Sequence, residues 1–193
     1  MRPLHLAAIN NNSAAAELLL KAGAIVDCPQ NEGMTALCIA AKRGAVDTMK
    51  VLLLNGANPN HPMTILGSRD SNSQKGYCKF PKKPVIILLP TMLALQSGPY
   101  TRSHDTISTS LWLLLKCGAR ISVPFELLPH FLPDNVLEAS RTPPSLQTYC
   151  ILMVRRLLVQ ANGGKSLFSV QHRFENLLPK SLVELLLFDF LSR

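Results

Sequence analysis

The segment RPLHLAA at residues 2–8 decides how this chain folds, because a close copy, TALCIAA, follows at residues 35–41. Each segment is followed by a leucine-rich run that ends in Gly-Ala, with the glycines at Gly23 and Gly56. Both landmarks return after 33 residues, and two landmarks at one spacing indicate a structural repeat. Repeat proteins bind partners through extended surfaces, so the pattern favours an interaction protein over an enzyme.

The pattern resembles the ankyrin repeat, in which a Thr-Pro-Leu-His-x-Ala-Ala segment is followed by a second helix and by Gly-Ala. Small pairs such as Ala7-Ala8 let paired helices approach closely, and leucines supply the apolar face of the second helix. Glycine at positions 23 and 56 tolerates the positive φ that ends a helix. The resemblance implies that His5 is a structural residue that ties the turn together through hydrogen bonds.

A third Leu-Leu-Leu…Gly-Ala run ends at Gly118, which lies 62 residues after Gly56. Residues 91–95 align with the start of the first helix of a repeat. We therefore predict two ankyrin repeats over residues 1–60, the first incomplete, and a divergent third repeat over 61–120 with a long insertion at about 62–89. The polar, basic stretch Thr64–Lys83 is typical of a loop or a disordered insertion, and residues 98–105 form a second, smaller insertion.

Residues 121–142 are predicted to form a helical cap or linker, broken by Pro124, Pro129 and Pro133. Its apolar residues would cover the end of the repeat stack: Phe125, Leu127, Leu128, Phe131, Leu132, Val136 and Leu137.

A new helix is predicted after Pro143-Pro144, with Ser145 as its N-cap. Leu146, Cys150, Val154 and Leu157 follow at spacings of four, four and three, so they share one face of the helix. An ordinary amphipathic helix whose apolar face is core would show the same spacing.

Residues 145–158 resemble the BC box of the SOCS box, in which a small residue precedes Leu-x-x-x-Cys-x-x-x-aliphatic. The resemblance implies that Ser145, Leu146, Cys150, Val154 and Leu157 contact elongin C. In the family, the leucine enters a pocket of elongin C and the cysteine packs beside it.

Residues 176–187 resemble part of a cullin box, and Leu178, Pro179, Leu182 and Leu186 fit its pattern. Asn176-Leu177 replaces the first Leu-Pro, and Leu185 replaces the tyrosine. The resemblance implies that the four matching residues bind a cullin, and that residues 143–193 form a small three-helix SOCS-box module.

Composition narrows the function classes. The net charge of +8 raises the possibility of a nucleic-acid partner, but no nucleic-acid motif accompanies the basic residues. The odd number of cysteines, five, and their wide spacing favour reduced thiols in an intracellular, cytoplasmic or nuclear protein. A zinc site that includes His61 and Cys78 is the alternative, without a C-x-x-C motif to support it. The chain shows no signal peptide, and its longest apolar run, Val85–Leu95, is too short to span a bilayer.

The predicted fold class is therefore all-α: an ankyrin solenoid followed by a SOCS-box module, without a cofactor. The resemblance implies a non-catalytic substrate receptor that binds elongin C with elongin B, a cullin (cullin-five is expected) with its RING protein, and a protein substrate on the repeats. The substrate would then be ubiquitinated and degraded. An ankyrin adaptor that recruits no ligase remains the alternative, with no nucleic acid or membrane partner in either case. A third possibility is that a chain starting inside a repeat binds elongins but recruits no target, and so competes with complete receptors.

Overall fold

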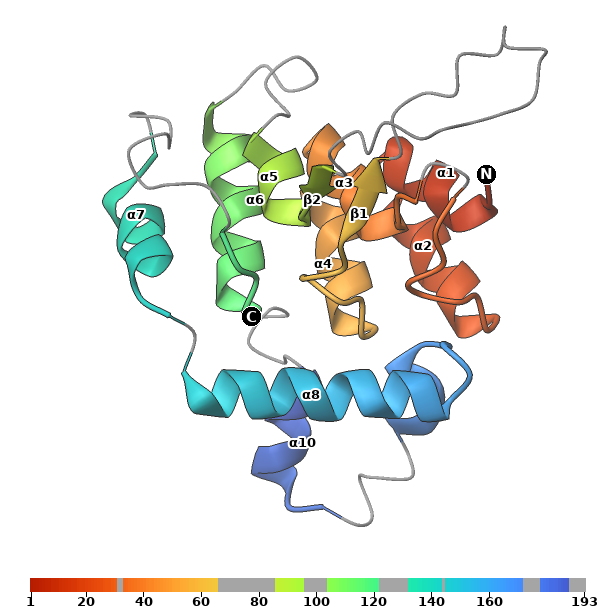
Figure 1. The fold of residues 1–193 in the computed structure, drawn as a ribbon. Coiled ribbons are helices and arrows are strands. Elements are labelled where there is room, and N and C mark those ends of the chain that lie inside the picture. The colour runs from red at the N-terminus through yellow and green to blue at the C-terminus, as the bar shows by residue number, and fades with distance from the viewer. Residues whose placement is uncertain are drawn as a thin grey trace, which may run out of the picture.

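The computed structural model describes residues 1–30, 33–65, 86–95, 104–121, 132–143, 145–171 and 178–187. These residues are mainly helical (Figure 1), with two three-residue strands and one isolated bridge. The helices are α1 Pro3–Ile9, α2 Ser13–Lys21, α3 Ala36–Arg43, α4 Val46–Leu54, α5 Pro90–Leu95, α6 His104–Lys116, α7 Asp134–Arg141, α8 Leu146–Ala161, the 3₁₀ helix η2 Leu167–Val170 and α10 Lys180–Leu187. The strands are β1 Met63–Ile65 and β2 Ile86–Leu88.

Three helical pairs stack side by side: α1 with α2, α3 with α4, and α5 with α6 (Figure 1). The first helix of each pair packs on the first helix of the next pair, and α2, α4 and α6 form the second layer. Local sequence sets where these helices begin. The Asn12 side chain accepts a hydrogen bond from the Ala15 N–H at 2.9 Å, and the Thr35 hydroxyl accepts one from the Cys38 N–H at 3.3 Å. This is the helical stack expected of an ankyrin solenoid.

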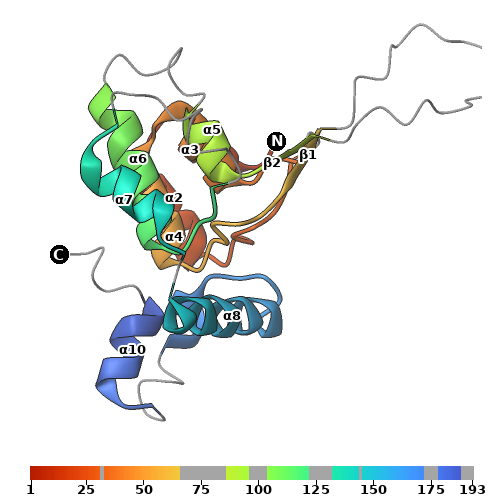
Figure 2. The ribbon, with the colours of Figure 1, turned by 60° about the vertical axis from the view of Figure 1, so that its left-hand side comes forward.

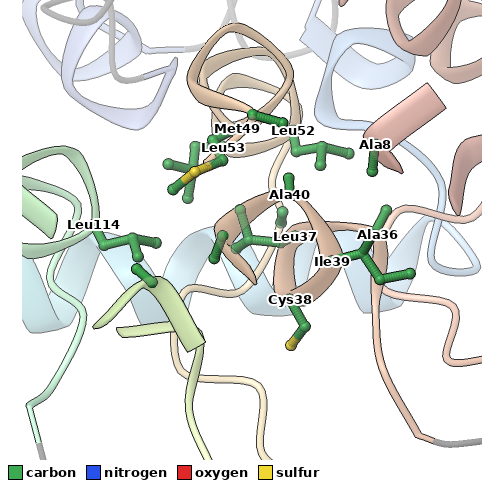
Figure 3. Close-up of a cluster of buried hydrophobic side chains, with 14 of the residues drawn as sticks. Ala8, Ala36, Leu37, Cys38, Ile39, Ala40, Met49, Leu52, Leu53 and Leu114 are labelled. Atoms are coloured by element: carbon green, nitrogen blue, oxygen red, sulfur yellow. The ribbon is translucent and has the colours of Figure 1, made fainter. Parts of the chain in front are cut away.

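The core of the stack combines small residues at helix contacts with large aliphatic residues between the layers (Figure 3). Ala8, Ala36 and Ala40 are fully buried, so neighbouring helices approach closely there. Leu52 and Leu114 come from the second helices of consecutive pairs and are also fully buried. One core therefore runs across all three pairs, which a single pair would be too small to form.

His5 has the structural role that the sequence predicts. Its Nδ1 accepts a hydrogen bond from the Arg2 N–H at 3.1 Å, and its Nε2–H donates to the Cys28 carbonyl oxygen at 2.8 Å. The imidazole is only 1% exposed, and burial lowers the pKa of His5 below its usual 6.5. The ring is therefore held neutral and joins the start of α1 to the turn that follows α2.

The two strands were not predicted from the sequence. β1 and β2 pair antiparallel, with Met63 opposite Leu88 and Ile65 opposite Ile86. Thr64 therefore belongs to a strand, whereas we predicted that it begins a loop. Three-residue strands leave too little alternation to detect. Both strands fall within the insertion predicted at about 62–89, whose residues 66–85 lie outside the described residues. Of the second predicted insertion, 98–105, residues 98–103 also lie outside them, whereas His104 and Asp105 begin α6, so this insertion was predicted two residues too long.

Helix α7 packs against α6, and its Val136 belongs to the core, together with Leu132 just before the helix. The remaining predicted cap residues, at 122–131, lie outside the described part of the chain.

Helix α8 runs beneath the stack, across the ends of the second helices (Figures 1 and 2). Helix α10 packs against α8, and its carboxyl end lies near the end of α4, since Arg155 bonds carbonyl groups of both helices. Among the described residues, no helix has the length and apolarity needed to cross a membrane.

Candidate functional site

Helix α8 carries the candidate site, and its ends are defined by local sequence. Ser145 adopts an extended conformation and its hydroxyl accepts a hydrogen bond from the Thr148 N–H at 3.2 Å, as the predicted N-cap should. The 16 residues from Leu146 to Ala161 contain neither glycine nor proline, and Gly163 follows with a φ of 66°. At 1.5 Å per residue the helix is about 24 Å long, enough to span several repeats.

The outer face of α8 is an apolar stripe that points to solvent. The exposed fraction is 79% for Leu146, 42% for Val154 and 58% for Leu157, and Cys150 is also exposed. These are the residues that the sequence singled out, and the helix brings them onto one face. Met153, 58% exposed, lies on the same stripe but was not predicted. Its position seven residues after Leu146, two helical turns, was the signal that could have identified it.

The inner face of α8 sits on the glycines that end the second helices. A methyl group on Gly118 would lie 2.6 Å from Leu152 Cδ1, and one on Gly56 would lie 2.8 Å from Val159 Cγ2. These separations are shorter than any normal carbon–carbon contact. Both glycines also have positive φ, 80° and 96°, which lets the second helices end there. The same two glycines therefore end helices of the repeats and leave room for α8.

Arg155 fixes the inner face by hydrogen bonds to helix carboxyl ends. Its guanidinium donates to the carbonyl oxygens of Leu53 and Leu54 at the end of α4, and to that of Leu186 near the end of α10. The side chain is only 2% exposed, and burial lowers the pKa of Arg155 to about 10, so it stays charged at neutral pH. Helix carboxyl ends carry partial negative charge, which stabilises the buried cation.

The segment after α8 continues this attachment. The Leu167 N–H donates to the Asn55 carbonyl oxygen at 3.1 Å, and the Ser166 hydroxyl donates to the Asn55 side-chain oxygen at 2.9 Å. The Val26 N–H donates to the Gly164 carbonyl oxygen at 3.0 Å. Residues 146–167 therefore touch the ends of all three helical pairs.

The four residues of the predicted cullin box differ in their exposure to solvent. Leu178, Pro179 and Leu182 are exposed, whereas Leu186 is only 8% exposed. Val183 is buried on the same helix, and α10 packs against α8. Leu186 therefore contributes to packing in this structure, while the other three residues are accessible.

Metal-binding clusters and thiols are the chemical features on which the described residues give evidence. No group of three or more His, Cys, Asp or Glu side chains among them could hold a metal ion. Burial raises the pKa of the Cys117 thiol to about 12 and raises that of Cys38, so both thiols are protonated and unreactive at neutral pH.

Residues 1–63 match a family model described as ankyrin repeats (3 copies). NF-kappa-B inhibitor alpha of Gallus gallus is 37% identical over 70 residues, which are 36% of this chain and 22% of that protein. The matched part thus spans about a fifth of that relative. The amino-terminal part of the chain consists of ankyrin repeats, which are modules that bind protein partners. The family match ends at residue 63 and does not include α8.

Proposed function

We propose that this protein is the substrate-binding, non-catalytic subunit of an elongin B/C–cullin ubiquitin ligase, acting inside the cell. The ankyrin repeats would hold the substrate, and the outer face of α8 would dock on elongin C. The protein would raise the concentration of substrate lysines near a ubiquitin-charged enzyme and supply no catalytic group itself.

The exposed apolar stripe of α8 is the single observation that carries this proposal. An amphipathic helix at the edge of a domain normally turns its apolar face inward. In α8, Leu146, Val154 and Leu157 face solvent, while the opposite face holds the helix to the repeats. Helix-in-groove recognition uses anchors at such spacings, and the residues are those that match the BC box.

The accessible side chains of α10 extend the proposal to the cullin. Leu178, Pro179 and Leu182 are exposed at the start of α10 and are available for a second contact. Because Leu186 is packed against α8, we assign the cullin contact to the first three residues only.

Co-expression with elongin B and elongin C, followed by size-exclusion chromatography, tests the proposal. We expect a stable ternary complex that the Leu146→Ala/Cys150→Ala variant does not form. Burying one leucine is worth about 2–3 kcal/mol, or roughly 30- to 150-fold in affinity. Leu6→Ala/Leu18→Ala is the matched control, because both leucines are exposed but lie on α1 and α2. A double BC-box variant that still co-elutes with elongin C would refute the assignment.

A second candidate is an ankyrin interaction protein in which α8 only closes the stack. The contacts of α8 with Gly56 and Gly118 favour this reading, because they make the carboxyl-terminal segment part of the repeat domain. Failure to bind elongins, together with unfolding of the repeats when residues 143–193 are removed, would support it.

A further inference from the structure

A groove runs along the flank of α8, between this helix and the turns that follow the second helices. Its volume is about 480 Å³, and its lining includes Ile25, Asn58, Arg120, Tyr149, Met153 and Arg156. Arg156 lies ten residues after Leu146, about 80° around the helix from it, so the basic side of the groove lies beside the outer stripe, and Met153 borders both. The elongin proposal therefore assigns no role to the groove lining other than Met153.

The groove joins an apolar floor to basic side chains. Ile25 and Met153 are 43% and 58% exposed, and Leu152 and Val159 lie deeper. Arg120 lies over the Tyr149 ring, with its guanidinium carbon 5.2 Å from the ring centroid, and Arg156 is exposed. A ligand here would therefore meet apolar surface and positive charge together.

Asp27 is the acidic residue of the lining, and it is already engaged. Its two carboxylate oxygens lie 3.1 and 3.2 Å from the Asn58 nitrogen, which donates its hydrogen to them. Burial raises the pKa of Asp27, while the Asn58 N–H and the charges of His61 and Arg156 act in the opposite direction.

Positive charge continues beyond Arg120 into a second hollow of about 520 Å³, between α6 and the end of α7. Among the described residues, its lining includes Lys116, Arg120 and Arg141 and no acidic side chain. The Lys116 ammonium lies 4.4 Å from the Trp112 ring centroid, so apolar and basic surface meet here too. Five arginine or lysine side chains thus line the two adjoining hollows, of which Arg155 is buried, and Asp27 is the acidic side chain among the described lining residues.

We infer that this groove binds an extended acidic segment of a partner protein, with at least one apolar side chain between its carboxylates. The stretch of α8 from Tyr149 to Gln160 covers about 16 Å, which about five residues of extended chain would span. Aliphatic and methionine side chains make up much of the floor, which suits a peptide better than stacked bases.

Selection of phage-displayed random twelve-residue peptides on the full-length chain tests this inference. We expect an excess of Asp and Glu around an apolar residue. The best synthetic peptide should bind the Arg120→Glu/Arg156→Glu variant at least tenfold more weakly. Lys50→Glu/Lys180→Glu is the control with the same change in net charge, because both lysines are exposed and line neither hollow.

The milder variant Arg156→Gln should weaken binding about threefold, and it guards against misfolding of the double variant. Selected peptides without an acidic excess, or equal affinity for the groove and control variants, would overturn the inference. The inference would also be overturned if the chain selected no acidic peptide but bound a single-stranded oligonucleotide through Arg120 and Arg156. Elongin binding should be unchanged in every groove variant, so the result does not depend on the proposed ligase role.

Discussion

The two faces of α8 differ in what they do for the molecule. The inner face holds a buried arginine and a 6% exposed valine against the repeats, whereas the outer face leaves three large aliphatic side chains 42–79% exposed. Both faces are rich in apolar residues, so hydrophobicity alone does not separate them. Stability therefore depends on one side of this helix and the proposed partner binding on the opposite side. Substitutions on the two sides should change these two properties separately.

Arg155→Ala should produce the largest loss of stability. It removes a buried cation whose hydrogen bonds join α8 to α4 and α10, and it leaves helix-end carbonyls without donors. We expect a loss of about 3–4 kcal/mol in the free energy of unfolding, measured by urea denaturation. Arg156→Ala, at the exposed neighbouring position, should change it by less than about 0.5 kcal/mol. Equal effects of the two substitutions would show that the inner face is not docked.

Gly56→Ala should be the next most harmful change, because it combines backbone strain with a clash. The added methyl would meet Val159 and Leu167 within 3 Å, at a φ of 96°. We expect a loss of about 3 kcal/mol in thermal or urea unfolding. Gly163→Ala isolates the strain, since its φ of 66° is also positive but no other atom lies within 4 Å of the added methyl. Gly163→Ala should cost about 1 kcal/mol of unfolding free energy. If Gly56→Ala costs no more than this, the contact of Gly56 with Val159 and Leu167 does not contribute to stability.

Val159→Ala and Leu157→Ala compare the two faces by truncation. Val159 is 6% exposed and Leu157 is 58% exposed. Truncating the valine should cost about 2 kcal/mol of unfolding free energy, and truncating the leucine less than about 0.5 kcal/mol. The order should reverse for elongin affinity, measured by calorimetric titration. A larger stability loss for Leu157→Ala would mean that the stripe is core.

The smallest effect concerns His5, which lies in the repeats and away from both faces. The pKa of His5 is lowered on folding, so the unfolded chain binds its proton more tightly than the folded chain does. The neutral imidazole therefore contributes fully to the free energy of unfolding above the unfolded pKa of about 6.5. This contribution is lost as the pH falls below that value. We expect the free energy of unfolding to decrease between pH 7 and pH 5, and we expect this decrease to be smaller in His5→Asn. Identical pH profiles for the two proteins would contradict the buried neutral imidazole.

The sequence predicted local features well. The repeat period located the glycines and the structural histidine, and the spacing after Pro143 predicted a helix with Leu146, Cys150, Val154 and Leu157 on one face. These features depend on residues that lie a few positions apart in sequence, so the spacing of residue types is enough to predict them.

Burial that depends on contacts between residues far apart in sequence could not be predicted in this way. Arg155 and Arg156 are adjacent and identical, yet one is buried and the other exposed. Their roles depend on carbonyl groups about a hundred residues away in sequence. Leu186 matched a cullin pattern, but the packing of α10 on α8 buries it.

Alkylation of Cys150 tests the central claim most directly, because this thiol lies on the outer stripe. The rate of iodoacetamide labelling at each cysteine can be followed by mass spectrometry, with and without saturating elongin B/C. We predict rapid labelling of Cys150 in the free chain and at least tenfold protection by the elongins, while buried Cys117 stays unlabelled throughout. Slow labelling of Cys150 in the free chain, or no protection by elongins, would contradict the division of α8 into a docked face and a binding face.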